Sequence, residues 1–242
     1  MRVGILSDVH ANLAGLEAAL AAVGDVDRLL FGGDLLGYYF DGPAVVRRLR
    51  ELGAECILGN HDVCLLAHLG LREPPAAPVP APAAYRARYG PGLERAAAEL
   101  SPDDLTWLAA LPTSRRLRLG GAEVLLVHGS PWHPVDEYIY PDHRAFGRFG
   151  RVDADLVVMG HTHHPLLRRE GAVTLLNPGS CGQPRDRDPR VSFAVLDVQG
   201  NALSFHLGRA AWDPAPLLAR CAALAPDVPL LRDLLTRRTL TG

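Results

Sequence analysis

The sequence contains no lysine, so all 25 of its basic side chains other than histidine are arginine. This absence excludes mechanisms that need a lysine amine, such as a phosphate-binding P-loop or a Schiff-base enzyme. The 27 acidic side chains leave a formal net charge of −2. A chain so close to neutral argues against binding through a large basic surface, and we expect no large nucleic-acid interface.

Cysteine is scarce and long hydrophobic runs are missing. The four cysteines, Cys56, Cys64, Cys181 and Cys221, are scattered and form no Cys-x-x-Cys pair. Their number and spacing argue against a disulfide scaffold or a zinc knuckle and suit a reducing cytosol. The first residues lack the pattern of a secretory signal, and no run of about 18 apolar residues predicts a membrane span. We therefore expect a cytoplasmic protein that contacts no membrane.

The composition, with 48% hydrophobic and 21% charged residues over 242 positions, predicts one globular domain with a sizeable core. Short apolar runs alternate with helical stretches, which is typical of an α/β fold. Strands are predicted at residues 3–6, 28–31, 55–58, 116–119, 124–127, 156–159, 173–176, 191–197 and 202–207. The last two strands are expected to form a hairpin through residues 198–201. Helices are predicted at residues 13–23, 44–52, 85–100 and 102–110, and two more at about 214–240.

A proline-rich segment separates the two halves of the chain. Residues 74–84 hold five prolines, which exclude a continuous helix or a central strand. We interpret the region of about 68–100 as an insertion or lid on the same domain, with a plain linker as the alternative. A domain boundary is disfavoured, because the polar residues described next lie on both sides of the segment.

Polar side chains follow five of the predicted strands at the point where each strand ends. The carboxyl ends of strands form the ligand crevice of open α/β sheets, so we expect these side chains to converge. Carboxylate, amide and imidazole groups without a thiolate suit Mn, Fe or Zn rather than Ca or a structural zinc site. Seven ligands are too many for one ion with an open position, so we predict two ions bridged by Asp34. The predicted ligands are Asp8, His10, Asp34, Asn60, His128, His161 and His163.

The spacing within this set favours a shared site. Asp8 and His10, like His161 and His163, are two residues apart, which on extended backbone places both side chains on one side. Each residue alone has a plainer explanation, such as a helix cap for Asp8, a turn residue for Asn60 or a structural histidine. Five strand ends with such residues are hard to explain as coincidence, because unpaired buried polar groups are costly.

Five short segments carry this set in a fixed order. They are Asp8-Val9-His10, Gly33-Asp34, Gly59-Asn60-His61-Asp62, Val127-His128-Gly129 and Gly160-His161-Thr162-His163. In that order they resemble the five blocks of the calcineurin-like metallophosphoesterase superfamily, and residues 7–13 and 177–180 resemble its small bacterial and archaeal phosphodiesterases. The resemblance implies a single domain of two mixed β-sheets packed as a sandwich and flanked by helices. It also implies a site for two divalent transition-metal ions, with Mn the first candidate and Fe, Zn, Ni or Co as alternatives.

The resemblance further implies a role for individual residues. One ion would be held by Asp8, His10, Asp34 and His163, and the other by Asp34, Asn60, His128 and His161. His61 would be the catalytic residue that protonates the leaving group, and Asp62 the carboxylate that orients it. The amide of Asn12 would contact a ligand residue rather than an ion.

The predicted function is hydrolysis of a small phosphodiester, such as a nucleotide, by a hydroxide that the metal pair activates. The leaving alkoxide would take its proton from His61. A phosphomonoesterase or a dinucleoside polyphosphate hydrolase on the same site is the alternative enzyme. An interaction scaffold without catalysis is the alternative from another class, disfavoured because every ligand position and His61 are filled. A homo-oligomer is compatible with the sequence.

Other residues are candidates for substrate contacts. Asn177 to Ser180 could present backbone N–H groups to a phosphate, or form only a tight turn. Arg185 could clamp a phosphate, although the nearby Arg187 and Arg190 favour an ordinary charged loop. A further set could wall a substrate pocket or simply pack together, namely Tyr38, Tyr39, His133, Tyr138, Tyr140 and His143.

Overall fold

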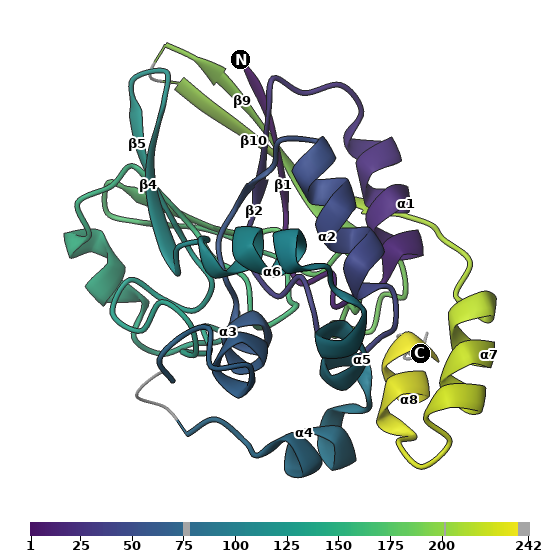
Figure 1. Ribbon diagram of the computed structural model, residues 1–242. Coiled ribbons are helices and arrows are strands. Elements are labelled where there is room, and N and C mark those ends of the chain that lie inside the picture. The colour runs from purple at the N-terminus through teal and green to yellow at the C-terminus, as the bar shows by residue number, and fades with distance from the viewer. Residues whose placement is uncertain (75–77, 201, 237–242) are drawn as a thin grey trace.

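Two mixed β-sheets of five strands each face one another at the centre of the molecule (Figure 1), in a computed structural model that describes residues 1–74, 78–200 and 202–236. The first sheet has the order β10-β9-β1-β2-β3, with β1 (Arg2–Leu6), β2 (Arg28–Phe31), β3 (Glu55–Cys56), β9 (Val191–Gln199) and β10 (Ala202–Ala210). The second has the order β4-β5-β6-β8-β7, with β4 (Ser114–Leu119), β5 (Ala122–Val127), β6 (Leu156–Val158), β7 (Leu166–Glu170) and β8 (Val173–Asn177).

The centre of each sheet is parallel. Strands β1, β2 and β3 run in one direction, as do β5, β6 and β8, and antiparallel strands complete both sheets. Side chains alternate between the two faces of a strand. Val3 and Ile5 of β1 therefore join the core between the sheets, whereas Leu6 joins the core under the helices. The loops at the carboxyl ends of these parallel strands carry the predicted site.

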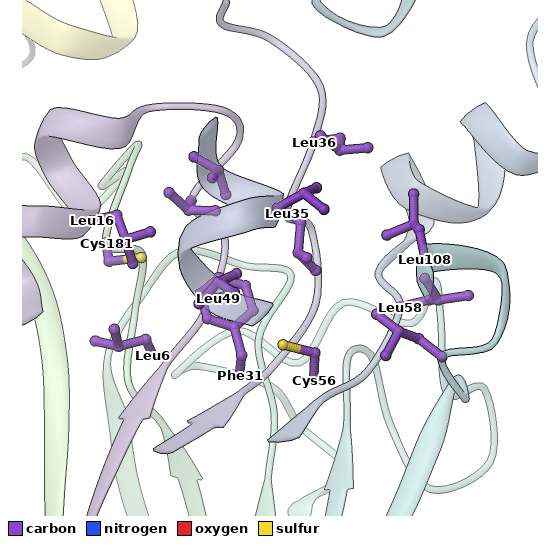
Figure 2. Packing of buried hydrophobic residues seen from close by; sticks show 14 of the residues in the cluster. Leu6, Leu16, Phe31, Leu35, Leu36, Leu49, Cys56, Leu58, Leu108 and Cys181 are labelled. Carbon is purple, nitrogen blue, oxygen red and sulfur yellow. The ribbon is translucent and has the colours of Figure 1, made fainter. Parts of the chain in front are cut away.

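Helices cover the outer faces of the sandwich. Helices α1 (Leu13–Val23), α2 (Gly42–Glu51), α3 (Asn60–His68), α5 (Gly92–Glu99) and α6 (Pro102–Ala109) share a core with the first sheet. Phe31 of β2 lies in this core with Leu49 of α2 and Cys56 of β3 (Figure 2). The 3-10 helix η1 (Phe146–Arg151) covers the second sheet. Helices α7 (Ala215–Leu224) and α8 (Leu230–Thr236) pack on the segment Tyr38 to Phe40.

The fold has the predicted class, and every predicted strand is present. The prediction missed β7, because Leu167, Arg168 and Arg169 are exposed on an edge strand and show no apolar pattern. It also missed η1 and α3. Helix α3 begins at Asn60, in a segment where the sequence pattern predicts only the end of a strand.

The helix predicted at residues 85–100 is two helices, α4 (Pro82–Tyr89) and α5. They separate at Gly90-Pro91, where Gly90 has a φ of +83° and proline cannot continue a helix. These helices follow the proline-rich segment, whose role as a lid stays a prediction. Pro75, Asn201 in the predicted hairpin turn, and the predicted end of the last helix at 240 lie outside the described residues.

All four cysteines are buried and free, so no disulfide contributes to the fold. Within the described ranges, no helix combines the length and the apolar character that crossing a membrane requires.

Replacing Phe31 with alanine tests the core beneath α2. The ring is fully buried, so Phe31→Ala should lower the free energy of unfolding by about 3–5 kcal/mol, through lost burial and the cavity left behind. Leu167→Ala on β7, at a position 45% exposed, is the control and should cost less than about 0.5 kcal/mol. Urea denaturation followed by circular dichroism measures both, and equal losses would contradict the proposed packing.

Candidate active site

The loops after the parallel strands hold their polar residues in a left-handed backbone conformation. The φ angles are 57° at Asp8, 50° at His10, 56° at Asp34, 67° at His161 and 60° at His163. The extended backbone predicted for the Asp8–His10 and His161–His163 pairs is therefore wrong. Such conformations cost about 1–3 kcal/mol each and cluster at functional sites, where the surroundings hold them in place.

Backbone contacts between loops stabilise these conformations. The Asp8 N–H donates to the carbonyl oxygen of Gly33 at 3.0 Å, and the His10 N–H to that of Asp34 at 3.0 Å. Gly59 lies so close that a Cβ there would be 2.2 Å from Oδ1 of Asp34, which only glycine avoids. The loops after β1, β2 and β3 thus fit together as one unit.

Three of the site histidines have the same orientation. Their Nδ1 atoms lie 3.0 Å from the Leu36 carbonyl oxygen for His10, 2.8 Å from that of Gly32 for His128, and 2.6 Å from that of Gln183 for His163. A carbonyl oxygen only accepts, so Nδ1 carries the proton in each ring. Nε2 is therefore the nitrogen of each ring that faces the site and that could bind a metal.

The lone pairs of the first group point at one another. Asp8, His10 and His163 form a buried group whose ligand atoms all lie within 4.8 Å of one another. The Nε2 atoms of His10 and His163 are 3.1 Å apart, and Nε2 of His163 is 3.3 Å from Oδ1 of Asp8. Two unprotonated nitrogens and a carboxylate at such distances repel one another unless a positive charge lies among them.

A second group lies beside the first. Asp34, His128 and His161 also have ligand atoms within 4.8 Å of one another. Asn60 belongs with them, because its Oδ1 is 3.2 Å from Nε2 of His128. The first group holds three of the four residues in one implied ligand set, and the second group with Asn60 holds the four residues of the other.

Asp34 stands between the two groups. Its Oδ2 is 3.6 Å from Nε2 of His10 in the first group and 3.2 Å from Nε2 of His128 in the second. The same carboxylate also belongs to a group with His10 and His61. One oxygen atom thus faces ligand nitrogens from both sides, which suits a carboxylate shared by two cations.

The charges of the site call for a cation. Burial raises the pKa of Asp8 to about 7, and the nearby Asp34 adds to this shift. Burial would also raise the pKa of Asp34, but His128 and His61 lower it well below its usual range. His128 is the counterpart: burial opposes its charge, yet Asp34 and Asp8 raise its pKa to about 9. Both carboxylates thus favour a positive charge at His128, and a metal cation at the site would supply such a charge.

The residues present fit transition-metal ions. Nε2 of His161 is buried without a hydrogen-bond partner among the described residues, which is costly for an atom that has no ligand. The donors are imidazole nitrogens with carboxylate and amide oxygens, a mixture that suits Mn, Fe or Zn. The seven predicted ligands are therefore brought together in an arrangement able to hold cations.

His61 and Asp62 begin helix α3 but face different partners. The His61 N–H donates to Oδ1 of Asp34 at 2.8 Å. The Asp62 carboxylate accepts from the N–H groups of Gly59, Leu35 and Leu36 at 3.0–3.2 Å. It thus caps α3 and fixes the loop after Asp34, rather than contacting the His61 ring as the resemblance implies.

The partner of the His61 ring is Tyr85, a residue that the sequence analysis did not single out. Nδ1 of His61 and the hydroxyl of Tyr85 form a short buried hydrogen bond. Burial lowers the pKa of His61 to about 4, despite the nearby charge of Asp34. Tyr85 lies on α4, outside the motif segments, so only the three-dimensional structure connects it with His61.

Three residues predicted to contact the substrate or to support the ligands instead form hydrogen bonds within the protein. Asn12 caps α1, with its Oδ1 3.0 Å from the Gly15 N–H and its Nδ2 donating to the Gly182 carbonyl at 2.7 Å. Asn177 donates to the Gly160 carbonyl at 2.7 Å and accepts from the Gly179 N–H at 2.8 Å. Ser180 donates to the Asp8 carbonyl and accepts from the N–H groups of residues 182 and 183. The geometry favours the tight turn over a phosphate-binding nest.

Arg185 differs from the arginines beside it. Its guanidinium donates to the Tyr38 hydroxyl at 2.8 Å and to Oε1 of Gln183 at 2.7 Å, whereas Arg187 and Arg190 are exposed. Its charge lowers the pKa of Asp8 and of four site histidines, which places it beside the site: the four are His10, His61, His161 and His163. The expectation of an ordinary charged loop does not hold for Arg185.

Two tyrosines from the loop after β5 lie beside His161. The ring centroid of Tyr138 is 3.8 Å from that of His161, and Tyr138 stacks on Tyr140 with an interplanar angle of 7°. Tyr138 is 48% exposed and Tyr140 38% exposed. An aromatic surface thus faces solvent directly beside a candidate ligand.

Replacing Asp34 with asparagine tests the shared carboxylate. Asp34→Asn keeps the size but removes the charge that faces both groups, so metal content should fall from about two ions per chain to one or fewer. The exposed Asp25 offers a matched control, Asp25→Asn, which should keep the full content. Elemental analysis after dialysis against buffer with Mn measures both. A full complement in Asp34→Asn would overturn the bridging role.

Known proteins resemble this chain over most of its length. A family model described as the calcineurin-like phosphoesterase superfamily domain matches residues 1–201. The crystal structure of a metallophosphoesterase from Sphaerobacter thermophilus has a TM-score of 0.76 and 33% identity, covering 98% of each chain. A protein named "Probable metallophosphoesterase" from Methanothermobacter thermautotrophicus is 27% identical over 216 residues, covering 86% of this chain and 92% of that protein.

A shorter match is to a protein of Acidovorax sp. named symmetrical bis(5'-nucleosyl)-tetraphosphatase, 33% identical over 137 residues. It covers 53% of this chain and 43% of that protein. Three findings agree: the family model matches most of the chain, a solved structure has the same fold over nearly all of it, and the five motif segments converge in space. This chain belongs to the calcineurin-like phosphoesterase superfamily.

Proposed function

We propose that this protein is a phosphodiesterase that uses two divalent transition-metal ions, Mn in first place, with Fe, Zn, Ni or Co as alternatives. The observation that carries this proposal is the pair of ligand groups on either side of Asp34, with His61 in contact with the same carboxylate. The residues proposed to hold the ions are Asp8, His10, Asp34, Asn60, His128, His161 and His163.

The two ions would supply the positive charge that activates a water molecule and neutralises the phosphate. His61 would act on the leaving group. As the bond between phosphorus and the ester oxygen breaks, its electron pair goes to that oxygen, which takes a proton from the His61 ring. Proton transfer from a positioned side chain contributes typically about 10²–10⁴-fold to the rate.

Arg185 favours a diester over a monoester. Its positive charge acts on Asp8 and on His10, His61, His161 and His163. A phosphodiester has one negative charge, whereas a monoester at neutral pH has nearly two. A single guanidinium beside the proposed metal ligands supports a substrate with the smaller charge.

A comparison of two chromogenic substrates tests this proposal. With Mn, kcat/KM for bis(p-nitrophenyl) phosphate should exceed that for p-nitrophenyl phosphate by about tenfold or more, a difference of about 1.4 kcal/mol in the barrier. Steady-state release of p-nitrophenolate measures both. Removal of the metal with a chelator should abolish the activity, and Mn should restore it. A preference for the monoester would favour a phosphomonoesterase, and activity that survives the chelator would exclude the metal-dependent mechanism.

A dinucleoside polyphosphate hydrolase is the second candidate. Two observations favour it: the similarity to a protein named as a bis(5'-nucleosyl)-tetraphosphatase, and the exposed tyrosine pair beside His161. Aromatic faces stack on nucleobases, with about 1–3 kcal/mol lost per base when the ring is removed. A nucleobase on Tyr138 would leave its phosphate chain at the metal ligands.

Replacing Tyr138 with alanine tests this second candidate. If diadenosine tetraphosphate is a substrate, Tyr138→Ala should raise its KM by about 5- to 150-fold, because the stacking energy is lost. Tyr138→Phe keeps the ring and is the matched control, expected to stay near the KM of the unchanged protein. Product release followed by chromatography gives the values. An unchanged KM in Tyr138→Ala would exclude stacking on this ring.

A further inference from the structure

Helix α4 reaches the candidate active site through one buried side chain. The structure describes every residue of α4, and Tyr85 is the one that is buried, with 3% of its surface exposed. Its hydroxyl forms the hydrogen bond with Nδ1 of His61 described above. A buried phenol needs such a partner, because an unpaired hydroxyl in the interior is costly.

Aromatic rings enclose His61 around this hydrogen bond. The ring centroid of His61 is 5.5 Å from that of Tyr85, 5.3 Å from that of Tyr89 and 4.9 Å from that of Tyr38. Tyr85 and Tyr89 both come from α4, and their centroids are 4.9 Å apart. The packing restricts rotation of the His61 ring, and the single polar contact within it selects which nitrogen faces α4.

The loop after Asp34 leaves room for this contact. Gly37 has a φ of +92°, and a Cβ there would lie 2.7 Å from the Tyr85 hydroxyl and 2.9 Å from Nδ1 of His61. Any side chain at this position would press on both partners of the hydrogen bond. Glycine therefore meets two needs here, the left-handed backbone and the close approach of the Tyr85–His61 pair.

We propose that Tyr85 is a positioning residue for the reaction: its hydroxyl holds Nδ1 of His61, so that Nε2 faces the leaving group of the phosphoester. This inference rests on the proposed function, in which His61 is the proton donor. The Asp62 carboxylate does not serve the ring, because its oxygens accept from three backbone N–H groups. A tyrosine from α4 thus takes the orienting role that the resemblance assigns to Asp62.

The hydroxyl suits this task in the acid form of His61. In the protonated ring Nδ1–H donates to the phenol oxygen, and in the neutral ring the phenol O–H can donate to Nδ1, so the contact holds the ring in both states. When the protonated ring acts, its Nε2–H bond breaks and a new O–H bond forms on the leaving oxygen. Tyr85 itself gains and loses nothing in this step. Burial raises the pKa of Tyr85 well above its usual range, so it remains a neutral hydroxyl.

Two diesters that differ only in their leaving group test the proposal. Methyl phenyl phosphate releases a basic phenolate that needs a proton, whereas methyl p-nitrophenyl phosphate releases a stable anion that does not. In the Mn-loaded full-length protein, Tyr85→Phe should lower kcat for the phenyl ester by about 10- to 100-fold, the usual cost of losing an orienting partner. The p-nitrophenyl ester should change by less than about threefold, with KM and metal content unchanged.

Tyr89→Phe is the matched control, since it loses a hydroxyl from the same ring cluster but leaves the Tyr85–His61 bond intact. It should keep the ratio of the two rates found in the unchanged protein. In His61→Ala the phenyl ester should already be slow, and adding Tyr85→Phe should slow it no further, because the two residues act as one unit. An additional loss in the double variant would overturn the proposal.

The outcomes separate this proposal from the proposed function. If His61→Ala leaves both rates unchanged, the role of His61 as proton donor fails. If His61→Ala slows the phenyl ester and Tyr85→Phe does not, the role of Tyr85 alone fails. Nitrogen NMR of the histidine rings gives a readout without turnover: the Nδ1 signal of His61 should shift in Tyr85→Phe and stay in place in Tyr89→Phe. An unmoved signal in Tyr85→Phe would overturn the hydrogen bond itself.

Discussion

The structure depends on negative charge and free nitrogen lone pairs that are buried together without enough positive charge to balance them. Asp8 and Asp34 are almost fully buried, and the Nε2 atoms of His10 and His163 face each other at 3.1 Å. In a low-dielectric interior a cation among these groups stabilises such an arrangement. Two features allow these groups to lie so close together. The backbone at Asp8 and His161 is left-handed, and Gly59 has no side chain to keep its loop away from Asp34.

Much of this could be predicted from the sequence, for a physical reason. Parallel strands end at the same edge of a sheet, so the polar residues after β1, β2 and β3 lie together, as do those after β5 and β6 in the second sheet. The packing of the two sheets brings both sets to one site. The types of the converging residues then limited the metals that the site would hold. The apolar runs also predicted the strands, because Val3, Ile5 and Leu30 fill one core between the two sheets.

What could not be predicted depends on contacts between side chains far apart in the chain. The i, i+2 spacing of Asp8 and His10 predicts extended backbone, but both residues have a left-handed conformation. In it their N–H groups donate to the carbonyl oxygens of Gly33 and Asp34. Tyr85 belongs to no motif, since only the packing of α4 over the site brings it to His61. Arg185 looks like Arg187 and Arg190 in the sequence and differs only in where the loop places it.

The helices α7 and α8 lie beyond residue 201, where the match to the family model ends. They nevertheless pack against residues 38–40, in the loop that follows Asp34. The Tyr39 hydroxyl donates to the Leu231 carbonyl at 3.2 Å, and Arg220 pairs with Asp41 at 2.7 Å. These contacts therefore hold the loop after Asp34 in place, although neither helix contains one of the proposed metal ligands. A chain that ended at residue 201 would lose strand β10 as well as both helices, and it would expose the side chains of Tyr39 and Phe40 next to the loop that contains Gly37.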